Sequence, residues 1–482
     1  RRSGRGRRSG RAEDLVKDGA VAGQGCERAR GLTRRESPPA VCVLGTAGAG
    51  EIRRGRPLVR GRPLVRVRPL VAGLALSGTL FAAAPAPEAR PLRPGETVLD
   101  RPRPEMTEHG GRLGRLWVRP TLTTALAFDD NVFANDDQRR SDFLLRTRPE
   151  VGAEADWRGH RAAVRVAAEQ GRYLAERSED YLDLDGEAYG RLQATRELHA
   201  SATARWGRGH VPRRSVESPA DAVEPTVFRT RSGELQLVHR AQRSVLRARL
   251  SARAVDYDDV AARTGGTINN DDRDRWVGEL EVAQRTPLSL RVDGFARTRI
   301  DRRQYAAALD DQGFVRDSYG HATVGGLTWR PTGLTTIEGY VGVLQRVYAD
   351  PRFARLIAPT AGLQVTTSPS QLTSLRLALD QSVRETAEPA ASGRLVTSLS
   401  ARVDHELRRD LLAGLEASYA GDDYRGLDRR DGLASVGLEL TYLASRHLHA
   451  RLSLRHDRRS SDVASARTFR RNRIEVGVEV RY

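Results

Sequence analysis

The side chains best suited to act on another molecule are arginines, which alternate with apolar residues in several segments of this 482-residue chain, with acids at similar spacing. Rings of charged side chains steer ions and charged solutes through channels. The alternative is that these residues form cross-strand ion pairs that only stiffen a sheet. We predict that they line a lumen, and ten candidates are Arg205, Arg247, Arg249, Arg253, Arg297, Arg299, Arg451, Arg455, Glu279 and Glu281.

Residues for bond-making chemistry are scarce. The single lysine, Lys17, lies near the N-terminus, which excludes enzymes that need a lysine in the body of the fold. The glycine-rich run at 45–50 lacks the Gly-Lys-Ser/Thr ending of a phosphate loop, and no Gly-x-Ser-x-Gly motif occurs. His447 and His449 share one strand face, but this is more typical of a hydrated turn than of a metal site. We therefore predict no catalytic residue, no metal and no cofactor.

Acidic residues gather in several of the long connections. The connection 209–225 holds Glu217, Asp221 and Glu224 among three prolines, and we predict that it folds into the lumen as a constriction. Acids at 129–137 and 269–272 offer the oxygen ligands that calcium prefers, although their spacing is not that of an EF-hand. Hydrated loop carboxylates are the simpler interpretation of both clusters.

The elements that position these side chains are β-strands. From residue 117 onward apolar and polar residues alternate with period two, and helical spacing is almost absent. In 244–255, Leu246, Ala248 and Leu250 lie on one face, whereas Arg247 and Arg249 lie on the other. We predict 18 strands, near 117–128, 142–157, 161–174, 181–195, 198–208, 226–239, 243–256, 273–285, 288–302, 317–330, 334–349, 356–367, 372–385, 394–407, 411–420, 432–445, 447–457 and 469–482.

The connections between these strands alternate between short and long. Each predicted strand has enough residues to cross a bilayer at a tilt. Lipid tolerates no unpaired sheet edge, so a sheet with one apolar and one charged face must close on itself there. Short turns at one end and long loops at the other are typical of an outer-membrane barrel, with the turns in the periplasm. The fold class predicted is all-β, an antiparallel up-and-down transmembrane barrel.

The excess positive charge lies mainly in the leader. Residues 1–86 carry 18 basic and 6 acidic side chains, which leaves 62 basic and 56 acidic in 87–482, so nucleic-acid binding loses its main support. We predict a disordered or non-native leader at 1–60, a signal peptide at 61–86, a periplasmic tether at 87–116 and the barrel at 117–482. The signal peptide is predicted from a basic stretch, an apolar run at 70–84 and the small residues that follow it.

Two short stretches resemble a known family. The C-terminal residues Glu475, Gly477, Val480 and Tyr482 resemble the terminal assembly signal of bacterial outer-membrane barrels, and Phe128-Asp129-Asp130-Asn131 resembles the signature that opens the beta-barrel porin 2 group. The resemblance implies an integral outer-membrane barrel that contacts lipid and lipopolysaccharide. It also implies recognition of the C-terminal strand by the barrel assembly machinery.

The function predicted is a porin-like channel for passive diffusion of small solutes, anions among them. The alternative is a barrel that serves the export of a surface polysaccharide, as some members of that group do. An active transporter is a weaker alternative, because residues 96–100 only faintly resemble an energy-coupling box and no plug domain precedes the barrel. A soluble secreted β protein is the fourth. The sequence leaves the transported solute and the oligomeric state open.

Overall fold

The computed structural model describes residues 95–107, 110–137, 139–384, 386, 391–463 and 466–482. The leader and signal peptide predicted for 1–60 and 61–86 lie outside these residues, as do both cysteines, Cys26 and Cys42.

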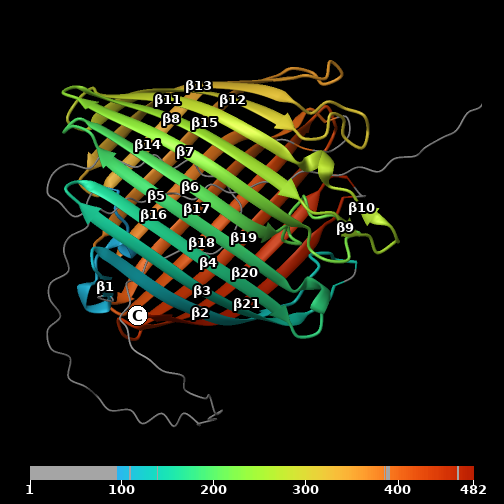
Figure 1. Cartoon of the computed structure of the whole chain (residues 1–482), viewed down its shortest axis with the longest axis horizontal. Coiled ribbons are helices and arrows are strands. Elements are labelled where there is room, and N and C mark those ends of the chain that lie inside the picture. Colours follow the sequence, from blue (N-terminus) through green and yellow to red (C-terminus); the bar gives the residue numbers. More distant parts are fainter. Residues whose placement is uncertain (1–94, 108–109, 138, 385, 387–390, 464–465) are drawn as a thin grey trace, which may run out of the picture.

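Eighteen long antiparallel strands form a closed barrel in which each strand pairs with its neighbours in sequence (Figure 1). The last strand pairs with the first, from Thr121 opposite Arg481 to Asp129 opposite Arg473. The eighteen strands are β2 Leu116–Asp129, β3 Asp142–Trp157, β4 His160–Tyr173, β5 Tyr181–Gln193, β6 Leu198–His210, β7 Val227–Ala241, β8 Ser244–Tyr257, β11 Arg275–Pro287, β12 Val292–Tyr305, β13 Ser318–Thr332, β14 Thr335–Tyr348, β15 Leu356–Ser370, β16 Thr373–Arg384, β17 Gly393–Arg408, β18 Leu411–Arg425, β19 Arg430–Leu443, β20 Leu448–Ser461 and β21 Phe469–Arg481. All 18 predicted strands are confirmed.

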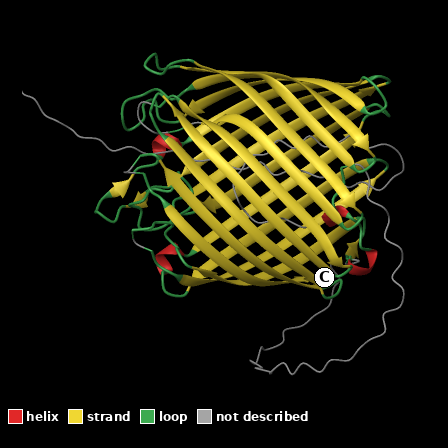
Figure 2. Ribbon diagram, turned by 180° about the vertical axis from the view of Figure 1, so that it is seen from behind, coloured by secondary structure: helices red, strands yellow, loops and turns green. Residues whose placement is uncertain are grey.

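The remaining elements are short and lie at the two ends of the barrel (Figure 2). Strand β1, Gly111–Leu113, pairs with the start of β2, and β9 (Val260–Ala261) pairs with β10 (Thr267–Ile268) inside a long loop. The 3-10 helices are η1 Val98–Asp100, η2 Pro104–Met106, η3 Arg177–Glu179 and η4 Asp271–Arg273.

No helix among the described residues is long and apolar enough to span a membrane.

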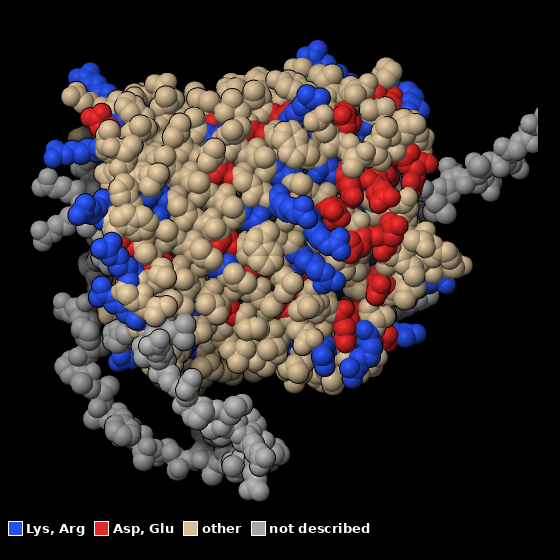
Figure 3. All heavy atoms as spheres, in the orientation of Figure 1, with Lys and Arg blue, Asp and Glu red and all other residues tan. Residues whose placement is uncertain are grey.

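Alternation along each strand gives the wall two different faces. In β7, Leu235 and Leu237 are more than half exposed, whereas Glu234 and Gln236, which alternate with them, are partly covered inside the barrel. The outward set makes the middle of the wall mostly uncharged on the face drawn in Figure 3. Glycine helps to pack this band: the Trp206 ring lies over Gly186 on the neighbouring strand, where a Cβ would clash. Arginine on a lipid-facing wall costs about 2–4 kcal/mol at the bilayer midplane, so this separation of faces is expected.

The turns at one end hold two to four residues, and the loops at the other end hold seven to seventeen, with one exception. The loop predicted for 421–431 is only a four-residue turn, because β18 and β19 keep pairing as far as Asp423 and Arg430. Gly426 takes a positive φ of 99° in that turn, and Arg429 binds Asp431 at 2.9 Å. Strand pairing therefore continues beyond the expected membrane boundary.

Apolar residues form small clusters near the ends of the barrel rather than one central core. At the long-loop end Ala127, Val132, Leu144 and Tyr173 pack together. Tyr173 and Phe469 are buried, because both fall on the inward register of their strands. Trp206, Trp276 and Tyr319 are exposed on the outer wall at that end, and Trp157 and Trp329 at the short-turn end.

Candidate functional site

The lumen wall is the candidate site, and all ten charged residues predicted for it lie on the inner faces of their strands. Their partners differ. Arg205 binds Glu187 at 2.8 Å, Arg451 binds Glu439 at 3.2 Å and Arg455 binds Asp457 at 3.0 Å. These close pairs match the ion-pair interpretation for part of the set.

The inner faces of β8, β11 and β12 form what we call the positive sector. Across these strands Arg249, Glu281 and Arg299 share one row, and Arg247, Ala283 and Arg297 share the next. Eight arginines face four acids here: Arg247, Arg249, Arg253, Arg275, Arg285, Arg297, Arg299 and Arg303, against Glu279, Glu281, Asp293 and Asp301.

Several arginines of the positive sector are only loosely paired. Arg249 lies 3.7 Å from Glu234, and Arg299 lies 3.8 Å from Glu279, which are long distances for charge-assisted hydrogen bonds. Among the described residues, Arg247 has no ion pair, and Arg297 lies 5.3 Å from the centre of the Tyr340 ring without a carboxylate partner. Guanidinium groups in this row are therefore available to a solute.

The inner faces of β3, β4 and β5 form an acidic sector. Five arginines face eight acids here: Arg146, Arg148, Arg161, Arg165 and Arg191, against Asp142, Glu150, Glu154, Asp156, Glu169, Asp183, Asp185 and Glu187. Arg148 and Arg165 each bind Asp185 at 2.7 Å, and Arg165 also lies 3.4 Å from Glu150. Among the described residues, four of these five arginines have a carboxylate within 4 Å, the exception being Arg191, whereas Arg247 and Arg297 of the positive sector have none.

Residues 211–226, which we call the crossing loop, connect β6 and β7 and reach the opposite wall. Glu217 is buried and binds Arg394 of β17 at 2.9 Å. Strand β17 is eight strands from β7 in one direction and nine from β6 in the other, so Arg394 lies across the barrel from the two strands that the loop connects. Arg214 extends toward Asp457 of β20 at 3.8 Å.

The other acids predicted for this loop lie elsewhere. Asp221 accepts a 2.5 Å hydrogen bond from Thr264 in the loop after β8, and Glu224 is exposed. The structure thus brings only Glu217 against the far wall. No sequence signal distinguished these three acids, because the difference depends on which side of the loop reaches Arg394.

A cavity of about 320 Å³ lies where the crossing loop meets its neighbours, lined by Phe133, Asn135, Arg213, Ala220, Asp221, Arg263 and Arg467. Arg213 is neutralised by Glu179, whereas Arg467 donates to the Ser215 carbonyl at 2.7 Å. Burial, together with the nearby guanidinium groups of Arg459 and Arg213, lowers the pKa of Arg467 to about 9. It stays charged at neutral pH and adds positive potential to this end.

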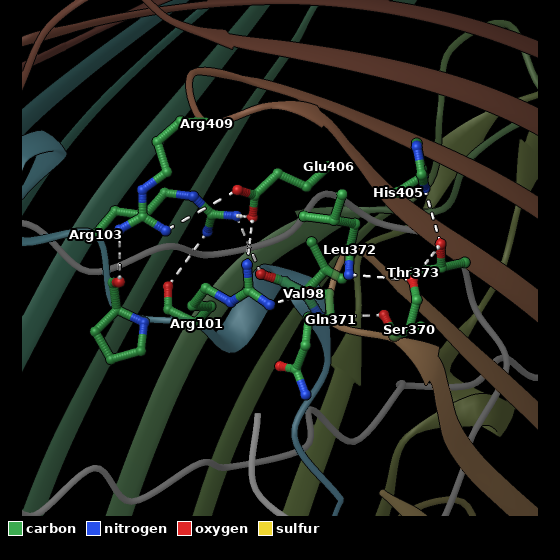
Figure 4. Close-up of polar contacts among 12 residues, drawn as sticks. Val98, Arg101, Arg103, Ser370, Gln371, Leu372, Thr373, His405, Glu406 and Arg409 are labelled. Atoms are coloured by element: carbon green, nitrogen blue, oxygen red, sulfur yellow. Dashed lines mark hydrogen bonds and ion pairs between the residues drawn. The ribbon is translucent and has the colours of Figure 1, made fainter. Parts of the chain in front are cut away.

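Residues 95–107, which we call the N-terminal strap, lie against the inner wall at the short-turn end (Figure 4). The strap is part of the segment predicted as a tether, and no sequence pattern indicates its contacts with the wall. Glu406 of β17 binds Arg101 at 3.1 Å and Arg103 at 2.7 Å, and all three side chains are buried. Arg409 binds Glu105 at 2.6 Å.

Apolar and backbone contacts complete the attachment of the strap. Val98 is fully buried against Leu412 and Leu443, and its N–H donates to Ser374 at 3.1 Å. Strand β17 is five strands from β2 through the closing pair, so the chain crosses part of the short-turn mouth before it enters the barrel.

Burial also affects the charged groups of the strap. Desolvation lowers the pKa of Arg103, and the Glu406 carboxylate only partly offsets that effect. Burial tends to raise the pKa of Glu105, but hydrogen bonds, one of them from Arg409, keep it below its usual value. Both groups are charged at neutral pH, and the ion pairs persist.

The two motifs that suggested a family lie together where the barrel closes. Asp129 is fully buried and accepts hydrogen bonds from Arg471 Nε at 3.0 and 2.9 Å, whereas Asp130 accepts two from Asn472 at 2.6 Å. Asn131 donates to the Arg470 carbonyl at 2.9 Å. The motif therefore binds the last strand directly.

The residues of the predicted assembly signal divide between the two faces of β21. Val480 and Tyr482 are exposed on the outside, whereas Glu475 faces the lumen and binds Arg146. Gly477 also faces inward, where a Cβ would lie 3.1 Å from that of Ala125. Their role in assembly stays a prediction.

The described residues contain no group of three or more His, Cys, Asp or Glu side chains that could hold a metal ion.

The search of curated proteins found no match to the sequence. Among solved structures, the Pseudomonas aeruginosa outer membrane protein OpdK is 12% identical with a TM-score of 0.40, covering 76% of this chain and 99% of that chain. Pseudomonas aeruginosa OccK2 (OpdF), solved in complex with glucuronate, is 12% identical with a TM-score of 0.42, covering 77% of this chain and 99% of that chain. A BenF-like porin from Pseudomonas fluorescens Pf-5 is 10% identical with a TM-score of 0.41, covering 76% of this chain and 99% of that chain.

The family comparison covers most of the barrel and the end of the strap. The sequence model described as "Putative beta-barrel porin 2" matches residues 103–482. The chain therefore belongs to the beta-barrel porin 2 family and is an integral outer-membrane β-barrel.

Proposed function

We propose that this porin-type barrel is a passive diffusion channel for small organic and inorganic anions. The observation that carries the proposal is the row of Arg247 and Arg297 in the positive sector, which has no acidic partner in the described structure. Charged walls around a wet, low-dielectric passage concentrate ions of the opposite sign. An anion beside this row would meet two guanidinium groups that form no ion pair with a carboxylate of the described residues.

The uneven charge of the wall supports an off-centre route. The acidic sector binds its own arginines at 2.7 Å, so it offers few free donors and would repel an anion. The crossing loop and the N-terminal strap narrow opposite ends of the passage, because each extends over the mouth from one wall to another. Barrels of 16–18 strands are wide enough to keep an aqueous path beside such segments.

The test is the reversal potential of the refolded protein in a planar bilayer under a KCl gradient. We expect preference for chloride, and R247Q/R297Q should bring the anion-to-cation permeability ratio close to one. The matched control, R148Q/R165Q, removes the same charge from the acidic sector and should change the ratio much less. A cation-selective wild type, or equal effects of both double variants, would contradict the proposal. The comparisons give no support for polysaccharide export.

A further inference from the structure

Two pairs of arginines face outward from the barrel near its long-loop end. Arg208 of β6 is the cross-strand partner of Arg229 of β7, and Arg458 of β20 is the partner of Arg470 of β21. Both pairs share the outward register of exposed apolar residues on the same strands, such as Leu235 and Leu454. Like charges directly opposite each other on one face of a sheet destabilise it.

The chain itself compensates the first pair. Arg229 binds Asp258 at 2.8 Å and lies 3.6 Å from Asp256 on the next strand. Arg208 donates to the Leu182 carbonyl. Acidic side chains gather over this end of the barrel in Figure 3, with arginines immediately beside them. A carboxylate thus supplies the negative charge that the first pair needs.

The second pair has no such compensation. Arg458 and Arg470 are exposed, and neither side chain forms an ion pair in the described structure. The acids nearby do not bind either guanidinium group: Asp130 binds Arg139 at 2.6 Å, and Asp136 accepts only the backbone N–H of Arg470 at 3.0 Å.

The remaining acidic neighbours do not pair with the Arg458 and Arg470 side chains either. Asp462 accepts the backbone N–H of Arg430 at 2.8 Å, and Asp457 faces the lumen, where it binds Arg455. Arg430 shares the outward register of β19, opposite Asp423 of β18, and Asp423 in turn binds Arg425 at 3.2 Å. Within the described residues no carboxylate forms an ion pair with the Arg458 or Arg470 side chain, so an anion that pairs with them comes from outside the chain.

The height of the second pair on the wall indicates where that anion comes from. Leu454 and Ile474, four residues below on the same strands, are exposed and apolar, and Phe128 is paired with Ile474 at that level. Four strand residues at a tilt of about 40° rise about 10 Å, which carries a long side chain from the hydrocarbon into the headgroup layer.

An aromatic residue beside the pair is consistent with that level. The Tyr419 ring of β18 leans across Gly432 of β19, where a Cβ would lie 3.0 Å from the Tyr419 hydroxyl and 3.4 Å from Ser460. Tyrosines with one apolar and one polar end are enriched at membrane interfaces.

We propose that Arg458 and Arg470 together bind a phosphate group of lipid A in the outer leaflet. Two guanidinium groups on adjacent strands can each donate paired hydrogen bonds to one phosphate, a geometry that lysine does not reproduce. The phosphate takes the place that Asp256 and Asp258 have beside Arg229. The acyl chains of the same molecule then lie along the apolar wall below.

The test is native mass spectrometry of the full chain, refolded in detergent and titrated with lipid A. We expect bisphosphorylated lipid A to bind about tenfold more tightly than the fully dephosphorylated form, because hydrogen bonds to charged groups contribute more than neutral ones. R458Q/R470Q should abolish this preference. The matched control R208Q/R229Q removes an equal charge from the compensated pair and should keep the preference.

Folding and the source of the phosphate are checked separately. Heat-modifiable gel migration must be the same for both double variants and the wild type. Free inorganic phosphate in large excess should not displace lipid A, because the acyl chains add their own contact with the wall. Equal binding of both lipid forms, equal loss in the two double variants, or displacement by inorganic phosphate would each overturn the proposal.

Discussion

Replacing Glu406 by glutamine tests whether the N-terminal strap narrows the channel. Glu406 binds two strap arginines, Arg101 and Arg103, and the side chains of all three are less than 10% exposed. Glutamine has nearly the same size but no charge, so both guanidinium groups would remain buried without a carboxylate. The wall itself should keep its fold, because Glu406 lies at the end of β17, beside a two-residue turn.

The magnitude follows from burial. Removing one partner of a buried ion pair costs about 3–5 kcal/mol, and each 1.4 kcal/mol is tenfold in an equilibrium. The equilibrium constant for docking of the strap should therefore fall by a factor of about one hundred to a few thousand. What remains is the packing of Val98, which contributes about 1.5–3 kcal/mol, and the more exposed Glu105–Arg409 pair, which contributes at most about 1 kcal/mol.

The assay is single-channel conductance in planar bilayers. We expect E406Q to spend more time in a state of larger conductance than the wild type. The control is D410N, which removes a carboxylate from the same end of the barrel, where Asp410 binds Arg408 at 2.6 Å without contacting the strap. Accessibility of the strap is read by maleimide labelling of T97C in a C26S/C42S background. If E406Q exposes residue 97 to the reagent and the conductance steps do not change, the reasoning is refuted.

Three further changes test other contacts. Asp129→Asn leaves a buried arginine without its partner and should lower the free energy of unfolding by about 3–5 kcal/mol, read as an earlier heat-induced shift in gel migration. Glu217→Gln frees the crossing loop from the far wall, and trypsin added outside liposomes should then cut after Arg214 much faster than in the wild type. Burial and the nearby charge of Asp311 raise the pKa of Asp272 to about 6, so its charged form opposes folding. The free energy of local unfolding of the loop after β8 should fall by up to about 3 kcal/mol as pH rises from about 4 through 6. Hydrogen exchange should show that fall in the wild type and not in D272N.

The barrel could be predicted because a membrane wall imposes a simple pattern on the sequence. Lipid on one side and water on the other force period two on every strand, and the alternation is visible even in short stretches such as 474–480. The pattern fails where the strands extend beyond the bilayer. In 421–431 charged residues on both faces look like a loop, yet Asp422 still pairs with Asp431 across β18 and β19.

The ends of the channel could not be predicted in the same way. The strap is rich in proline and arginine, a composition typical of a linker, and its attachment depends on one buried carboxylate about 300 residues away. Inward-facing charges were predictable as a class from register alone. The absence of a partner for a given arginine depends on the row of residues that faces it across three strands. A single sequence does not give the register between those strands. Arg247 and Arg249 look equivalent in the sequence, but among the residues that the structure describes only Arg249 has a carboxylate within 4 Å.

The signature after Phe128 is better explained by closure of the barrel than by transport. Joining β2 to β21 brings together residues 342 positions apart, and a flexible chain of that length costs about 5 kcal/mol to close. Asp129, Asp130 and Asn131 all bind residues of the last strand, beyond the final register pair of the closing strands. They therefore offset the closure cost where the ladder ends. A solute-binding role would require these groups to face open water, whereas Asp129 and Asn131 are fully buried.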